Sequence, residues 1–280
     1  MEQVVLDGRT AAKAAKEDLR TRVEVLKKKG VAPALAVVLV GDDPASKVYA
    51  EQKRKNCDSV GVAFSFYQLP EDTSEDELIQ LVARLNADAK VHGILVEMPL
   101  PKQISNERVQ AAIAPEKDVD GSNPANLGCL LAGLPSLRPC TPQGAMYLME
   151  KYGVELEGKH AVVVGRSTIV GKPVALLLLE KNATVTLCHS RTENLAEVVR
   201  SGDIVIAAVG RPRMITKDMI KPGAVVVDVG INSTETGIVG DVDYDDVLPA
   251  AGAISPVPGG VGPLTIAMLL GNVITAAELA

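Results

Sequence analysis

Tyr49 and Lys53 lie four residues apart, and their types and spacing suggest chemistry more directly than any other pair in this chain. In a helix, a lysine four residues after a tyrosine shares its face, so both polar heads can point into one cleft. Such a pair could carry out proton chemistry on a ring held above it. The alternative is that Lys53 is a surface residue on a solvated basic face, together with Lys47, Arg54 and Lys55.

The segment around this pair is predicted to be a helix that follows a buried strand. Asp43 can cap the first turn, Pro44 suits the first helical position, and Gly61 lies just beyond the expected end. The preceding run Leu35–Val40 is continuously apolar, as in a strand covered on both faces. Open α/β folds place ligands at such strand-to-helix junctions.

A second candidate site is the glycine-containing turn Gly165–Pro173, which directly follows the apolar run Ala161–Val164 and opens a predicted helix. The free N–H groups and the dipole of a helix N-terminus both favour a phosphate there. The spacing differs from G-x-G-x-x-G, so the turn is either a variant dinucleotide site or a structural connection between strand and helix.

The end of the next predicted strand favours NADP over NAD. Folds that bind NAD usually carry an Asp or Glu here for the ribose 2′-hydroxyl, whereas this chain has Ser190 and Arg191, which could hold a 2′-phosphate together with Arg166. Arg191 could instead be a solvated loop residue, and His189 is interpreted as a strand-end residue without a titration role. The segment Asp228–Asn232 follows a further strand and could lay backbone groups against the nicotinamide. The candidate cofactor-binding residues are Gly165, Arg166, Ser167, Gly171, Ser190, Arg191, Gly230 and Ile231.

The remaining pattern predicts an α/β protein of two lobes, because apolar strands alternate with helical segments in both halves. Between the halves, Gly, Pro and Asn are dense from Lys117 to Pro142, which predicts long functional loops. Thr141 and Pro142 suggest a cap and first turn for a connecting helix that ends near Tyr152. The expected helices are 10–29, 44–60, 74–87, 141–152, 170–180, 194–200 and an apolar one from about 263, and the expected strands are 34–40, 63–69, 93–96, 160–164, 184–188, 204–209 and 224–229.

Composition excludes several classes of function. The 280 residues are 47% hydrophobic and 23% charged, with a net charge of −6, no tryptophan and 2% aromatic residues, which disfavours nucleic-acid binding. The four cysteines show no metal-binding spacing and are expected to be reduced thiols, with no metal site. Glu2 and Asp7 leave no apolar core for a signal peptide, and no apolar run is expected to approach the ~20 residues that span a bilayer. We therefore expect a soluble, cytoplasmic protein without a membrane partner.

With both candidate sites described, the chain resembles the bifunctional methylenetetrahydrofolate dehydrogenase/methenyltetrahydrofolate cyclohydrolase family over essentially its whole length. The resemblance rests on Tyr49 and Lys53, on the Gly165 turn and on the strand end His189–Thr192. Further matching segments are Gly93–Pro101, Lys117–Gly121, Cys140–Pro142 and Pro256–Pro263.

The resemblance implies two reactions at one site. Hydride passes from 5,10-methylenetetrahydrofolate to NADP, and the methenyl product is hydrolysed to 10-formyltetrahydrofolate, a one-carbon interconversion that serves purine biosynthesis. It further implies a homodimer, a folate in the cleft between the lobes, a catalytic lobe over residues 1–140 and a Rossmann-type NADP lobe over 141–262. The helix from about 263 to 280 is expected to pack back onto the first lobe.

The resemblance also assigns roles to individual residues. Lys53 would transfer protons, Tyr49 would stack on the folate, and Asp120 would bind the pterin ring, although an Asp before Gly121 could simply form a turn. Asp118 is interpreted as such a turn residue. The expected catalytic residues are Lys53, Tyr49, Glu97 and Asp120, and the expected substrate-binding residues add Val96, Met98 and the flexible loop Pro258, Gly259, Gly260, Val261 and Gly262.

Glu97 departs from the family pattern, which usually has glutamine at this position. A carboxylate near Lys53 would raise the pKa of the lysine, whereas burial would lower it. We therefore hypothesise an intact dehydrogenase with a weakened or pH-shifted cyclohydrolase, unless Glu97 is protonated and behaves like glutamine. The alternatives are a dehydrogenase without hydrolysis, a non-catalytic dinucleotide-binding or sensor protein, and a two-domain dehydrogenase of an amino or hydroxy acid.

Overall fold

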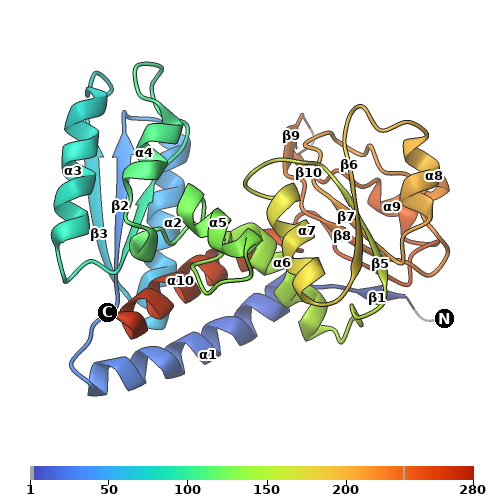
Figure 1. The fold of residues 1–280 in the computed structure, drawn as a ribbon, viewed down its shortest axis with the longest axis horizontal. Helices are drawn as coiled ribbons and strands as arrows, with labels where there is room; N and C mark the ends of the chain where they lie inside the picture. The colour runs from blue at the N-terminus through green and yellow to red at the C-terminus, as the bar shows by residue number, and fades with distance from the viewer. Residues whose placement is uncertain (1–2, 236) are drawn as a thin grey trace. The chain divides into compact units, whose positions relative to one another are not determined.

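A computed structural model describes residues 3–235 and 237–280, which form two compact units (Figure 1). The three-stranded unit comprises Ala15–Cys140 and Met268–Ala280, and the six-stranded unit comprises Thr141–Ala267 and the described residues up to Ala14. Residues 3–14 therefore belong to the six-stranded unit and not to the expected lobe of residues 1–140. The reason is that strand β1 (Val4–Val5) pairs with β11 (Ala253–Ile254) of the six-stranded unit. Helices α1 (Gly8–Lys28) and α10 (Gly262–Leu279) each contribute residues to both units.

The three-stranded unit has a parallel sheet in the order β3-β2-β4, formed by β2 (Ala34–Val40), β3 (Ala63–Leu69) and β4 (Gly93–Val96). Side chains of β2 alternate between two cores, as the strand period of two requires. Leu35 and Val37 pack with residues of α1, α2 (Pro44–Val60) and α10, whereas Val38 and Val40 pack with residues of α3 (Glu75–Ala87) and α4 (Asn106–Ala112). Both faces are covered, which explains the continuous apolar run.

Helix α2 begins and ends where the sequence predicts. The Asp43 carboxylate accepts a hydrogen bond from the Ser46 N–H at 2.8 Å, Pro44 lies in the first turn, and Gly61 closes the helix with φ of 84°. A left-handed residue at this position is best supplied by glycine. Because both ends of α2 are defined in this way, the position of Lys53 along the helix is defined as well.

The prediction of long loops from Lys117 to Pro142 is wrong in part. The structure has the 3-10 turn η1 (Pro115–Lys117) and helix α5 (Pro124–Leu131), and α6 (Cys140–Lys151) begins one residue before the expected cap at Thr141. Asn123 caps α5 by accepting a hydrogen bond from the Ala125 N–H at 2.7 Å, with Pro124 in the first turn. The polar residues that suggested a loop therefore mark a helix start.

The six-stranded unit has a parallel sheet in the order β1-β11-β8-β7-β5-β6. Its other strands are β5 (His160–Val164), β6 (Thr184–Cys188), β7 (Ile204–Ala207) and β8 (Val225–Asp228), and a separate antiparallel hairpin is formed by β9 (Asn232–Thr234) and β10 (Gly237–Val239). The remaining elements of this unit are α7 (Gly171–Glu180), α8 (Leu195–Arg200), α9 (Tyr244–Val247) and the 3-10 turn η2 (Lys217–Met219). This α/β architecture confirms the predicted fold class.

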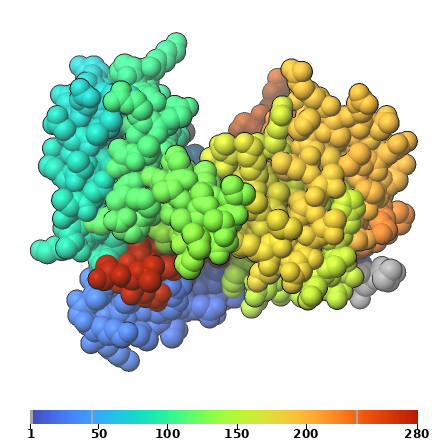
Figure 2. Space-filling view, in the orientation of Figure 1, coloured from blue at the N-terminus to red at the C-terminus, as the bar shows by residue number. Residues whose placement is uncertain are grey.

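Helix α10 contradicts the expectation that no apolar run approaches the length needed to span a bilayer. Residues 261–279 form a 19-residue stretch with a mean hydropathy of 1.4, long and apolar enough by length and composition to cross a membrane. A little over half of the stretch, 56%, is buried, and Leu270, Val273 and Ile274 lie in the core of the three-stranded unit. Leu279 is 80% exposed, and the C-terminal end of α10, drawn red, reaches the surface in Figure 2. This burial is typical of a core helix.

Candidate active site and cofactor site

The carboxyl edge of the three-stranded sheet holds the first candidate site. The chain passes from β2 to β3 on one side and returns to β4 on the other, so the switch point lies between β2 and β4. Helix α2 begins just after β2, and Glu97 directly follows β4, where its N–H donates to the Val38 carbonyl at 2.8 Å. The topology thus brings α2 and Glu97 to the same edge of the sheet.

Lys53 and Glu97 form a close ion pair at this edge. The Lys53 Nζ donates to Glu97 Oε1 at 2.7 Å and to Oε2 at 3.0 Å, and the two side chains are 15% and 11% exposed. The same Nζ lies 5.9 Å from the centroid of the Tyr49 ring, which is on the same helix face and is itself exposed. Tyr49 and Lys53 therefore share one face, as their spacing predicts, and the lysine is held by a carboxylate from another element.

Asp120 belongs to the same electrostatic cluster. Burial raises the pKa of its carboxyl to about 6, the negative charge of Asp118 adds to the effect, and the cation of Lys53 opposes it. Asp118 itself is fully buried and accepts hydrogen bonds from the Asn123 N–H at 2.7 Å and from Asn126 Nδ2 at 2.9 Å. Asp118 therefore anchors the start of α5, in agreement with its interpretation as a turn residue. Asp120 is the carboxylate whose pKa is affected by the charges of Lys53 and Glu97.

Val96 and Met98 flank Glu97 and differ in exposure. Val96 is buried in the core between β2 and α3, whereas Met98 is 40% exposed. Of these two predicted substrate-binding residues, Met98 presents the more accessible side chain.

The predicted substrate loop Pro258–Gly262 lies in the six-stranded unit. Its backbone packs closely on the start of α1: the Gly8 N–H donates to the Gly259 carbonyl at 2.8 Å, and a Cβ at Gly8 would lie only 1.6 Å from the Gly260 carbonyl oxygen. Val261 is buried, and Gly262 opens α10. Glycine at position 8 is therefore required by the close approach of this loop.

The second candidate site is a cavity of about 330 Å³ at the switch point of the six-stranded sheet, between β5 and β7. A Cβ at Gly165 would lie 2.0 Å from the Ala208 carbonyl oxygen, and one at Gly171 would lie 2.2 Å from the Gly165 carbonyl oxygen. The Ser167 hydroxyl accepts hydrogen bonds from the N–H groups of Val170 and Gly171, each at 3.2 Å. The turn is therefore tight and presents backbone and a helix N-terminus to the cavity, as a phosphate site requires.

The described residues that line this cavity are cationic or neutral, with no carboxylate among them. They include the predicted Arg166 and Ser190, and also Arg211, which the sequence analysis missed. Arg191 is exposed, and its side chain is not in the lining of the described cavity; its N–H donates to Nδ1 of His189 at 3.2 Å. This composition suits an additional phosphate and provides no acidic partner for a free 2′-hydroxyl.

Two buried aspartates hold loops of the six-stranded unit, and the loop held by Asp241 lines the cavity, whereas Gly230 and Ile231 are not among the residues that line it. Asp241 accepts hydrogen bonds from the backbone N–H groups of residues 209, 210 and 211 at 2.6, 2.9 and 2.9 Å, and from Asn232 Nδ2 at 2.9 Å. Asp228 accepts from the N–H of the predicted Gly230 at 2.8 Å, and its pKa is raised to about 6, mainly by burial. Ile231, also predicted, is 65% exposed. The two aspartates therefore fix the backbone of residues 209–211 and of Gly230 by accepting hydrogen bonds from it.

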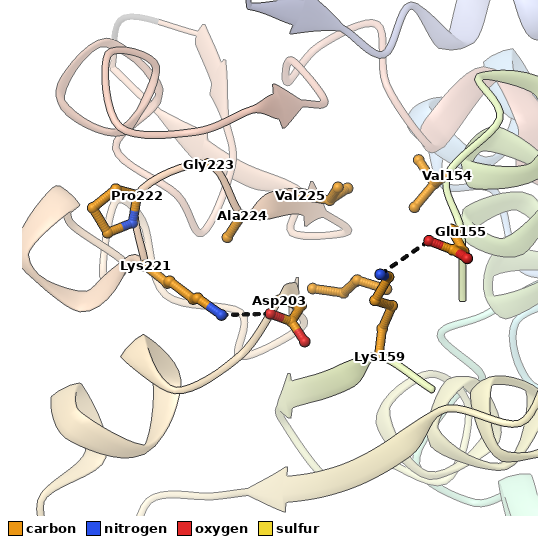
Figure 3. Close-up of a pocket in the computed structure, with 10 residues that line it drawn as sticks. Val154, Glu155, Lys159, Asp203, Lys221, Pro222, Gly223, Ala224 and Val225 are labelled. Atoms are coloured by element: carbon orange, nitrogen blue, oxygen red, sulfur yellow. Dashed lines mark hydrogen bonds and ion pairs between the residues drawn. The ribbon is translucent and has the colours of Figure 1, made fainter. Parts of the chain in front are cut away.

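A further cavity of about 290 Å³ lies in the six-stranded unit, where β7 and β8 begin (Figure 3). Its charged side chains pair with one another: Lys221 with Asp203 at 2.6 Å and Lys159 with Glu155 at 2.9 Å. Ligands of parallel sheets bind at the carboxyl ends of the strands, and this cavity is at the amino ends. We therefore do not assign it to the cofactor.

Comparison with known proteins supplies the family. The model of the tetrahydrofolate dehydrogenase/cyclohydrolase catalytic domain matches residues 6–120, and the model of its NAD(P)-binding domain matches residues 139–280. The bifunctional protein FolD of Geotalea uraniireducens is 55% identical over 275 residues, covering 98% of each chain. The chain belongs to the tetrahydrofolate dehydrogenase/cyclohydrolase family.

Solved structures of family members agree with this fold. The bifunctional FolD enzyme of Campylobacter jejuni has 46% sequence identity and a TM-score of 0.97, covering 99% of each chain. The Trypanosoma brucei methylenetetrahydrofolate dehydrogenase-cyclohydrolase, solved with NADP and an inhibitor, has 39% identity and a TM-score of 0.92, covering 100% of this chain and 98% of that one. The predicted resemblance is therefore confirmed.

The two candidate sites fall in different domains of the family. Lys53, Glu97 and Asp120 fall within the catalytic-domain match, and the Gly165 turn and Asp241 fall within the NAD(P)-binding match. Sequence reasoning missed Arg211 and Asp241. Arg211 carries a visible signal, because it is a cation that follows the carboxyl end of β7, where ligands of parallel sheets bind. Asp241 carries no such signal, because the strand before it, β10, belongs to the antiparallel hairpin.

Proposed function

We propose that the protein oxidises 5,10-methylenetetrahydrofolate to the methenyl form with NADP and hydrolyses that product to 10-formyltetrahydrofolate. The observation that carries the proposal is the cluster of Lys53, Glu97 and Asp120 at the switch point of the catalytic unit, in a chain that matches both domains of the family. The cluster offers a proton-transfer group and a carboxylate for a pterin ring. It needs only a bound nicotinamide to complete the first reaction.

The residues of the cavity fit NADP. Gly165 and Gly171 permit the tight turn that would offer backbone N–H groups to phosphates, and Arg166, Ser190 and Arg211 offer cationic or hydroxyl partners for a 2′-phosphate. When bound, the nicotinamide would accept a hydride from the folate. The protein's own contribution to that step is to hold two rings face to face.

The three-stranded unit, which carries Lys53 and Asp120, would supply the proton chemistry. The carboxylate of Asp120 would accept hydrogen bonds from N–H donors of the pterin, and Tyr49 would stack on the ring from the same helix face as Lys53. Hydrolysis adds water to the methenyl carbon, and one C–N bond then breaks as its nitrogen gains a proton. Lys53 would shuttle protons in that ring opening.

We further propose that the protein is a cytoplasmic homodimer with no membrane or nucleic-acid partner, and that its product serves purine biosynthesis. The low aromatic content and net charge of −6 support the absence of a nucleic-acid partner. The dimer follows from the family resemblance. Size-exclusion chromatography with light scattering would report twice the chain mass of 29.4 kDa if the dimer forms, and a single chain mass would reject it.

A paired assay of purified protein tests the proposed function. Methylenetetrahydrofolate is supplied with NADP or NAD for the hydride step, and methenyltetrahydrofolate alone is supplied for hydrolysis. Both activities, with NADP preferred, are expected. Hydride transfer alone would leave a monofunctional dehydrogenase, and loss of both activities would favour a dinucleotide-binding protein without catalysis. Activity only on amino or hydroxy acids would reject the proposal.

A further inference from the structure

The charge balance of the catalytic cluster carries an inference that rests on the proposed function and deepens it. Glu97 holds the Lys53 ammonium through both of its oxygens, at 2.7 and 3.0 Å, so this pair is internally neutral. Asp120 is a second carboxylate within electrostatic range of both partners. With Asp120 ionised, the three side chains together carry one negative charge.

The folate changes charge during the two reactions. Hydride transfer breaks a C–H bond of the methylene carbon, and the electron pair leaves with the hydrogen for the nicotinamide. The folate is oxidised, and a positive charge is spread over the N–C–N unit of the methenyl form. Hydrolysis then consumes one water, releases one proton and returns the folate to an uncharged formyl amide. The one-carbon unit is thus cationic in the methenyl form and uncharged both before and after it.

We propose that Glu97 sets the balance between the two reactions by stabilising this cation, so that the protein favours hydride transfer over hydrolysis. A fixed carboxylate lowers the free energy of a developing positive charge in a partly desolvated site. The same carboxylate slows attack by water, because hydrolysis discharges the cation.

The burial of the pair makes this effect large enough to measure. Both side chains are less than one-sixth exposed, so bulk water and salt screen the Glu97 charge only partly. A full charge removed at such a site is expected to change the relative rates on the order of tenfold. Glutamine has nearly the shape of glutamate, so Glu97→Gln removes the charge and leaves a hydrogen-bond acceptor for Lys53.

The experiment compares wild type with Glu97→Gln and with Glu97→Asp, which keeps the charge. Glu24→Gln, at an exposed position on α1, is the control for net charge. Hydride transfer from methylenetetrahydrofolate with NADP and hydrolysis of methenyltetrahydrofolate without nucleotide are measured separately. The affinities for methenyltetrahydrofolate and for tetrahydrofolate, which lacks the N–C–N cation, are measured by calorimetry.

We expect Glu97→Gln to raise the ratio of hydrolysis to hydride transfer on the order of tenfold and to weaken binding of the methenyl cation by a similar factor. Tetrahydrofolate affinity should change less than about twofold, and Glu24→Gln should keep the wild-type ratio. The ratio in Glu97→Asp, which keeps the charge, should stay below that of Glu97→Gln. An unchanged or lowered ratio, or equal weakening of both folates, would overturn the proposal; a lowered ratio would identify Glu97 as a base for water attack. Absence of both activities in wild type would instead reject the proposed function itself.

Discussion

Replacing Asp241 with asparagine should destabilise the NAD(P)-binding unit and weaken NADP binding together. Each carboxylate oxygen of Asp241 accepts two hydrogen bonds: Oδ2 from the N–H groups of Val209 and Gly210, and Oδ1 from the Arg211 N–H and Asn232 Nδ2. An asparagine NH₂ cannot accept, so at least two of these four partly buried bonds are lost, together with the acceptor of their donors. A hydrogen bond to a charged group contributes about 1.5–3 kcal/mol, and relief of the buried charge offsets part of the loss. We therefore expect about 2–4 kcal/mol of destabilisation.

Urea unfolding followed by circular dichroism measures this change, with Asp245→Asn as the matched control. Asp245 is exposed on α9, so its loss of charge should alter the free energy of unfolding by less than about 0.5 kcal/mol. The KM for NADP should rise in Asp241→Asn, because Asp241 holds the backbone of Arg211 at the cavity. Equal stability of the two variants, or an unchanged KM in a destabilised Asp241→Asn protein, would refute the role given to this carboxylate.

Three further outcomes are expected. Arg211→Ala should lower the preference for NADP over NAD about threefold to tenfold, measured as the ratio of kcat/KM values. Lys181→Ala, which removes an exposed cation, is the control and should leave that ratio unchanged. Equal losses with both nucleotides would show that Arg211 does not contact the extra phosphate. The pKa of Asp120 is about 6 against an ordinary 3.8, so folate affinity should fall as the pH drops through 6 and the carboxylate is protonated. The affinity of Asp120→Asn should not depend on pH in this range. A pH-independent affinity in wild type would contradict the role of Asp120 in binding the pterin. Because the raised pKa makes the folded state bind more protons than the unfolded state between pH 3.8 and 6, ionised Asp120 destabilises the folded state at neutral pH, and this destabilisation should lessen as the pH falls over that range. It should be seen as a rise in the free energy of unfolding of wild type relative to that of Asp120→Asn.

Much of the fold could be predicted because its local signals agree with its tertiary packing. Strand β2 appears as an uninterrupted apolar run since both of its faces are buried, and α2 has a cap, a first-turn proline and a terminal glycine. The shortest strands could not be predicted: β1 and β11 have two residues each and exist only because each pairs with a strand far away in the sequence. Helix α5 was missed because the same Asn and Pro residues serve both loops and helix starts.

The candidate sites show the same division. The shared face of Tyr49 and Lys53 follows from helix geometry alone, so their spacing was sufficient. The contact between Lys53 and Glu97 joins residues 44 positions apart, and only the order of strands in the sheet brings them together. The role of Asp241 beneath Arg211 was invisible for a similar reason, since its partners come from loops 30 to 32 positions away.

The most direct test of the central claim, that one lysine-centred site serves both reactions with different demands, is a comparison of Lys53→Met with wild type in both assays. Hydrolysis of methenyltetrahydrofolate should fall about 100-fold or more, because its proton transfer is lost, while hydride transfer to NADP should remain measurable. The double variant with Glu97→Gln removes the carboxylate that would otherwise be left unpaired, and it should show the same separation. Retention of full hydrolysis in both variants would contradict the account.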